Sequence, residues 1–236
     1  MDQINRTKSI SIWIFIVPFI AVNACLLTIT QFQSIFPNHE DLIHNTFPYI
    51  DGGASISRTA RPYPNWLIFK PAMFLTSYLL IKYWIYNRNI IKFFNKDHKY
   101  IKRIFNFGVA SAIALTIHSI FLGVKFDYDL YKLFRRVILL SFIIFELIAQ
   151  AYLVATFFSL KDTLRKYINP NILRLKIILV SALLIIAAIS IPIISLPGDY
   201  FFGLNLKFLK HALEWDYFLG IISFYFLTFL MWKRIN

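Results

Sequence analysis

Six long apolar runs, separated by shorter polar segments, dominate the pattern of the chain. Each run has about 20 residues, the length that an α-helix needs to cross roughly 30 Å of hydrocarbon. In lipid the backbone must satisfy its own hydrogen bonds, so each run is expected to be helical. The pattern therefore predicts an all-α, polytopic transmembrane bundle of about six helices, with one domain over 1–236. The expected spans are 9–31, 66–86, 104–124, 136–159, 176–196 and 214–232.

The amino-acid composition supports this assignment. Hydrophobic residues make up 58% of the 236 residues and charged residues only 16%, against about 25% charged residues in ordinary soluble domains. That much apolar surface exceeds what one globular core can hide, so lipid must cover part of it. Cys25 is the single cysteine, and therefore no disulfide can form within the chain.

The distribution of basic residues predicts the orientation. With the N-terminus inside, most Lys and Arg fall on the cytoplasmic side, chiefly in the connections 88–103 and 161–176, as the positive-inside rule requires. Both termini are therefore expected in the cytoplasm, with the plasma (inner) membrane and an endomembrane equally open. The net charge of +13 is explained by this topology and by attraction of the basic side to anionic lipids. No nucleic-acid partner is therefore predicted.

The outer loop 32–65 is the only connection long enough to form a site of its own. Within its string PYIDGG, Gly52 and Gly53 permit positive φ and a pair of N–H groups that face an anion. Arg58 and Arg61 follow, and guanidinium groups favour bidentate contacts with phosphate. The predicted site for a lipid headgroup consists of Asp51, Gly52, Gly53, Arg58 and Arg61.

A structural alternative stays open for this loop. The two arginines could instead pair with Asp51, Glu40 or Asp41 and pin the loop onto the helices. His39 and His44 also lie among these acids, but their spacing matches no strong ligand pattern, so no metal site is predicted.

Ionisable residues inside the predicted spans are candidates for function because they are costly in lipid. Weak catalytic candidates are His118, Glu146, His211 and Glu214, which we expect to converge on one outward-facing polar cavity. The alternative for Glu146 is a hydrogen-bonded carboxyl that locks helix packing. One intramembrane histidine cannot supply the paired axial ligands of a b-type haem, and no nucleotide or metalloprotease motif occurs, so no cofactor is predicted.

Two short strings resemble a known family. Pro48-Tyr49-Ile50 with the following glycines, then Pro62 or Pro64 and Ile68-Phe69, form the first, while Glu214-Trp215, Phe224 and Thr228-Phe229 form the second. The chain resembles the superfamily of the damage-regulated autophagy modulator (DRAM), the FGF-receptor-activating protein and the GPI-anchor lipid remodelling factor. It departs from the family pattern at Asp51, where a serine is usual, and at Arg135 and Arg136, near which a histidine is usual.

The resemblance implies six helices, inside termini and a lipid-linked role at the outer leaflet. The leading hypothesis is a non-enzymatic protein that binds or organises lipids, with anionic headgroups and other membrane proteins as partners. One alternative is a membrane-embedded hydrolase or acyltransferase that remodels lipids. Another is an accessory subunit of a larger membrane complex.

Overall fold

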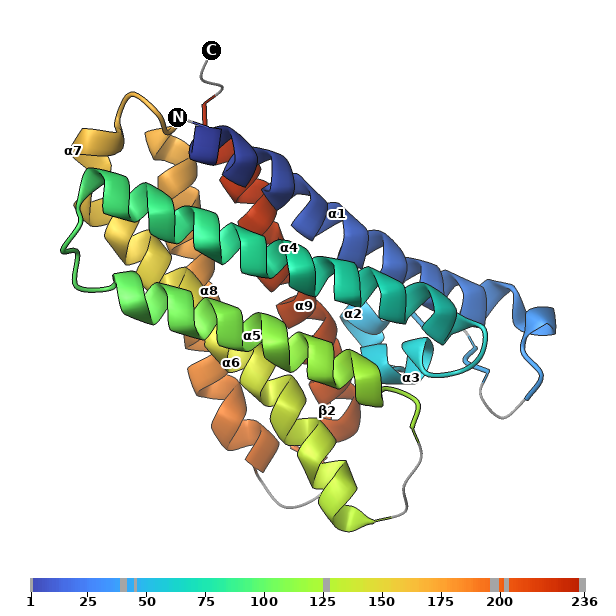
Figure 1. The fold of residues 1–236 in the computed structure, drawn as a ribbon. Helices are drawn as coiled ribbons and strands as arrows, with labels where there is room; N and C mark the ends of the chain where they lie inside the picture. The colour runs from blue at the N-terminus through green and yellow to red at the C-terminus, as the bar shows by residue number, and fades with distance from the viewer. Residues whose placement is uncertain are drawn as a thin grey trace.

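A computed structural model describes residues 2–38, 42–44, 46–124, 128–195, 200–201 and 204–233. Within these residues the chain is a helical bundle, and the predicted fold class is confirmed (Figure 1). Its long helices each contain one of the predicted spans or most of it. They are α1 (Asp2–Gln31), α4 (Asn65–Phe94), α5 (Ile101–Phe121), α6 (Asp129–Ser159), α8 (Pro170–Ser195) and α9 (Leu206–Met231).

Short elements occupy the connections. The first long connection contains a 3₁₀ turn, η1 (Gln33–Ile35), and the helices α2 (Pro48–Asp51) and α3 (Ile56–Ala60). Helix α7 (Lys161–Leu164) precedes α8. Strands β1 (Tyr200–Phe201) and β2 (Leu204–Asn205) pair antiparallel before α9, with Tyr200 opposite Asn205.

Among the described residues, five helices are long and apolar enough to cross a membrane: α1, α5, α6, α9 and residues Pro170–Ser190 of α8. They make the chain compatible with a multi-pass membrane protein. Helix α4 is equally long but contains Lys70, Lys82, Arg88 and Lys92, so its crossing stays a prediction. The Lys70 ammonium donates to Ile120 O at 3.3 Å, and that of Lys82 lies over the ring of Tyr78.

Neighbouring helices pack in a consistent order around the bundle. Helix α1 packs against α4 and α9, α5 lies between α4 and α6, and α8 packs against α6 and α9. The start of α1 and the end of α9 lie at the same end of the bundle (Figure 1), where Lys8 Nζ donates to Trp232 O at 2.6 Å. We call this the terminus end, and the opposite end, which carries α2 and α3, the loop end.

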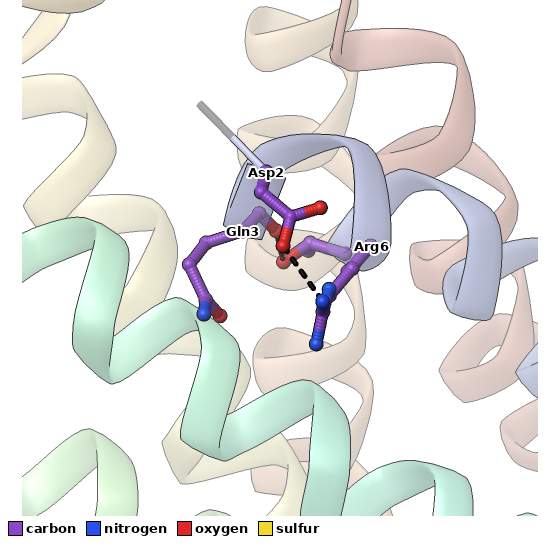
Figure 2. A network of polar contacts seen from close by, with 4 residues as sticks. Asp2, Gln3 and Arg6 are labelled. Atoms are coloured by element: carbon purple, nitrogen blue, oxygen red, sulfur yellow. Dashed lines mark hydrogen bonds and ion pairs between the residues drawn. The ribbon is translucent and has the colours of Figure 1, made fainter.

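An ion pair lies on the surface of the first turn of α1. Arg6 Nη2 is 2.8 Å from Asp2 Oδ2, and the Gln3 side chain points away from the pair (Figure 2). Both charged side chains are more than half exposed. An exposed i, i+4 pair of this kind stabilises a helix by only about 0.3–0.5 kcal/mol, so it decides little about the fold.

Asn65 fixes the loop end onto the bundle. This side chain is fully buried at the start of α4. Its Nδ2 donates to Cys25 O of α1 and to Thr59 O of α3, both at 2.8 Å. Its Oδ1 accepts a hydrogen bond from Thr28 Oγ1 at 2.6 Å. One amide therefore joins three helices, which places α3 against the loop end of the bundle.

Asn65→Ala is expected to destabilise the protein strongly. The substitution removes three hydrogen bonds, to Cys25 O, Thr59 O and Thr28 Oγ1, and each such bond typically contributes about 0.5–1.5 kcal/mol. Thermal unfolding in detergent should show a clear drop in Tm. Asn171→Ala on exposed α8 surface is the matched control, and an equal Tm change in both variants would contradict this role.

Candidate functional site

A cavity lies inside the bundle between α1, α4, α5, α6 and α9. Its volume is about 80 Å³, and α3 contributes Ile56 and Ser57 to its loop end. Its walls are mostly aliphatic and aromatic side chains. The residues with polar groups that line it are Ser57, Thr76, His118, Glu146, Glu214 and Tyr225. Most of the lining is therefore apolar, whereas a polar cavity was predicted.

Three of the four candidate catalytic residues share this cavity. His118 comes from α5, Glu146 from α6 and Glu214 from α9. His211 is not among the lining residues, and its Nδ1 lies 2.9 Å from Gly52 O. His211 therefore holds the α2 turn against α9, and the structure does not bring it to the other three.

Glu146 is a fully buried hydrogen-bond acceptor. Ser111 Oγ of α5 donates to Oε2 at 2.5 Å, and Gln150 Nε2 donates to Oε1 at 3.1 Å. Tyr225 of α9 also donates to Oε1. Because three donors from three helices converge on one carboxyl group, the geometry matches the alternative in which Glu146 locks helix packing.

Lys176 is a second buried ionisable residue, and the sequence analysis misplaced it. The charge pattern predicts it in the cytoplasmic connection 161–176, but its side chain is fully buried. Its ammonium donates to Thr228 Oγ1 of α9 at 2.7 Å and lies 3.8 Å from the centroid of the Phe224 ring. The hydroxyl of Tyr83 is also 3.2 Å from Thr228 Oγ1, so α4, α8 and α9 meet here.

Helical periodicity explains this error. Arg174 is exposed, and a residue two positions further along a helix points to nearly the opposite side. Lys176 therefore shares a face with Leu173, Val180 and Leu183, which are all buried. The helical spacing of these three apolar residues is the feature of the sequence from which burial of Lys176 could be predicted.

Ser57 lies between charged groups at the loop end of the cavity. Its Oγ accepts hydrogen bonds from Arg61 Nη2 at 3.3 Å and from Arg135 Nη2 at 3.2 Å. The carboxylate of Glu214 faces the backbone N–H groups of Ile56 and Ser57. Arg135 also acts electrostatically on His118. The sequence marks Arg135 only as a departure from the family pattern and does not predict its place beside the cavity.

The PYIDGG turn does not present its N–H groups to an anion, which corrects the prediction. Gly52 N donates to Pro48 O at 3.2 Å, and Gly53 N donates to Asp51 Oδ1 at 2.7 Å. Gly52 has a φ of +61°, and a Cβ there would collide with the carbonyl of Phe208. The glycines therefore shape the turn and let it approach α9 closely.

Asp51 serves this same turn. Its carboxylate also accepts from Thr46 Oγ1 and from Phe47 N, both at 2.7 Å. Burial tends to raise the pKa of Asp51, but the hydrogen bonds from Thr46, Gly53 and Phe47 outweigh that tendency and lower the pKa. The carboxylate is thus occupied locally and pairs with neither Arg58 nor Arg61.

The remaining loop predictions have mixed outcomes. Arg58 is exposed on α3, close enough to His211 to act on it electrostatically. Glu40, Asp41 and His39 lie outside the described residues. Within the part of the chain that the structure describes, no group of three or more His, Cys, Asp or Glu side chains is placed to hold a metal.

The two strings of the family resemblance lie against each other. Tyr49 of the first string packs edge-on against Trp215 of the second, with 4.9 Å between ring centroids. Trp215 Nε1 donates to Ala54 O at 2.8 Å, and the Tyr49 hydroxyl donates to Asn23 Oδ1 of α1 at 3.1 Å. The strings therefore form one junction between the loop and the bundle.

Comparisons with models of protein families, with curated proteins and with solved structures gave no match.

Lys176→Met is expected to leave stability unchanged or to raise it. Methionine fills a similar volume and removes the cost of burying an ammonium group, which often exceeds what its contacts return. Lys176→Glu should instead prevent stable folding, because it buries a carboxylate without donors. Tm values in detergent test both, with exposed Arg174→Met as the control. A large decrease in Tm in Lys176→Met without a decrease in Arg174→Met would show that the ammonium group is needed for folding.

Proposed function

We propose that this protein is a multi-pass membrane protein that binds a lipid inside its helical bundle. An apolar part of the lipid lies against the apolar walls of the cavity, and the headgroup lies at the loop end beside Ser57. One observation carries the proposal: the cavity has apolar walls, and the guanidinium group of Arg135 reaches Ser57 at its loop end. Ligand pockets typically combine apolar walls with a few placed polar groups.

The basic groups at the rim suit an anionic group of the lipid. Arg61 and Arg135 converge on one hydroxyl, and guanidinium groups are well matched to phosphate oxygens. Arg58 lies on the outer surface of the same short helix, where it adds to the positive field. In this proposal Asp51, Gly52 and Gly53 act indirectly, because they shape the turn that docks on α9.

The loop end is proposed to face the outer leaflet, with both termini in the cytoplasm. The common position of the two helix ends at the terminus end agrees with this arrangement (Figure 1). Membership of the DRAM-like superfamily remains a proposal, and the contact between Tyr49 and Trp215 supports it by giving the two matching strings a joint role.

A lipid-remodelling activity is the second candidate function. His118 and Glu214 line one cavity and could act on a bound lipid as a base and an acid. Glu146 is the less suitable of the carboxyl groups, since hydrogen bonds from Ser111, Gln150 and Tyr225 already occupy it. If the wild-type protein converts a labelled lipid and His118→Ala does not, the result would favour this candidate over binding alone.

Ile143→Trp is expected to reduce the amount of lipid that co-purifies with the protein. Ile143 lines the cavity, so the indole ring would occupy the space proposed for the apolar part of the lipid. Ile144→Trp is the matched control, because the next residue on the same helix is 47% exposed. Lipid extracted from the purified variants is measured by mass spectrometry. Equal lipid content in wild type and both variants would contradict binding in the cavity.

Cysteine labelling tests the proposed orientation. In a Cys25→Ala background, Ile50→Cys should react with a membrane-impermeant thiol reagent added to intact cells, because Ile50 is 81% exposed on α2. Lys96→Cys, an exposed position in the connection between α4 and α5, should react only after the cells are opened. The reverse pattern would place the loop end on the cytoplasmic side.

A further inference from the structure

Guanidinium groups and a carboxyl group meet at the loop end of the cavity. Arg61 and Arg135 both donate to the Ser57 hydroxyl, at 3.3 and 3.2 Å, and Glu214 lies against the backbone N–H of the same residue. Among the described residues Arg135 and Glu214 form no ion pair with each other; the salt bridge found there joins Arg6 and Asp2. Ser57 therefore separates two guanidinium groups from one carboxyl group beside one open space.

Two polar groups beside this space lack partners in the part of the chain that is described. The His118 side chain is only 8% exposed and lines the cavity, but its ring takes part in none of the side-chain hydrogen bonds found among these residues. The Nε atom of Arg135 is buried without an acceptor. Unsatisfied buried groups are destabilising, by about 1–3 kcal/mol each. A ligand that supplies an acceptor to Arg135 and a donor to His118 would remove this cost.

We propose that these groups recognise a zwitterionic phospholipid whose headgroup joins a phosphodiester to a primary ammonium, as in phosphoethanolamine. The inference deepens the proposed function and rests on it. Phosphate oxygens accept hydrogen bonds from Arg135 and from the Ser57 hydroxyl, whose own hydrogen has no acceptor among the contacts described. The ammonium group donates to the Glu214 carboxylate and to a ring nitrogen of His118.

The proposed class follows from the chemistry of each partner. A headgroup whose only polar group is a phosphate would satisfy Arg135 but offer no donor to the Glu214 carboxyl group or to the His118 ring. A neutral diacylglycerol would leave the buried Nε of Arg135 unsatisfied. A quaternary ammonium has no N–H to give, whereas carboxylate and imidazole acceptors need a donor. The primary ammonium satisfies all of these groups together.

Competition between lipids in nanodiscs tests the headgroup. The full-length protein is placed in nanodiscs with equal amounts of dioleoyl phosphatidylethanolamine, phosphatidylcholine, phosphatidylglycerol and diacylglycerol. Bound lipid is then identified by native mass spectrometry after gentle release. Wild type is expected to retain phosphatidylethanolamine about tenfold over each competitor, a ratio that corresponds to about 1.4 kcal/mol.

Two substitutions separate the two halves of the headgroup. Glu214→Gln should lose the preference for phosphatidylethanolamine over phosphatidylglycerol while still binding phospholipid. Arg135→Gln should lose the preference for phospholipid over diacylglycerol. Asp216→Asn and Arg136→Gln are the matched controls, because both are exposed neighbours on the same helices, and they should behave as wild type. Tm values confirm that each variant is folded.

The outcomes distinguish this inference from the proposed function. Wild type that retains lipid in the cavity with no preference among headgroups overturns the headgroup assignment but leaves lipid binding intact. A preference of the wild-type protein for phosphatidylglycerol or phosphatidylcholine also overturns the headgroup assignment. This result comes from the wild type alone and does not depend on whether a variant folds. Wild type that retains none of the four lipids overturns both.

Discussion

Polar groups buried within an apolar bundle must find partners on neighbouring helices, and α9 supplies those partners here. Tyr225 donates to Glu146 of α6, and Thr228, about one turn further on, accepts from Lys176 of α8 and pairs with Tyr83 of α4. Since a lost partner leaves a costly unsatisfied group, these contacts hold four helices in one register. The cavity exists because that register keeps the helices around it at fixed positions.

The same helix also positions the loop end. In its first half, His211 contacts Gly52 and Glu214 faces α3. Trp215 donates a hydrogen bond to Ala54 O. The loop is therefore not an independent lid on the bundle. Its turn, α3 and the rim of the cavity all take their positions from α9 and from the amide of Asn65, so a change in α9 reaches both the packing centre and the proposed binding rim.

Sequence reasoning succeeded where one physical requirement decides the structure. Apolar runs of spanning length must be helical, and His118, Glu146 and Glu214 stand out because ionisable groups are rare in such runs. It failed where two local effects compete. Gly53 was expected to offer its N–H to a ligand, but the adjacent carboxylate of Asp51 takes it first. Lys176 falls in the basic connection 161–176 in a charge count, because such a count ignores which side of a helix a residue occupies.

The two cavity carboxyl groups show how one residue type can have two roles within a single space. Glu146 has three side-chain donors, from α5, from its own helix and from α9, so its oxygens are committed to holding the bundle together. Within the described part of the chain, Glu214 faces the backbone N–H groups of Ile56 and Ser57 and retains acceptor capacity toward the cavity. A carboxylate can accept about four hydrogen bonds. It follows that ligand chemistry belongs at the loop end, where acceptor capacity remains, while the middle of the bundle fixes the shape of the cavity.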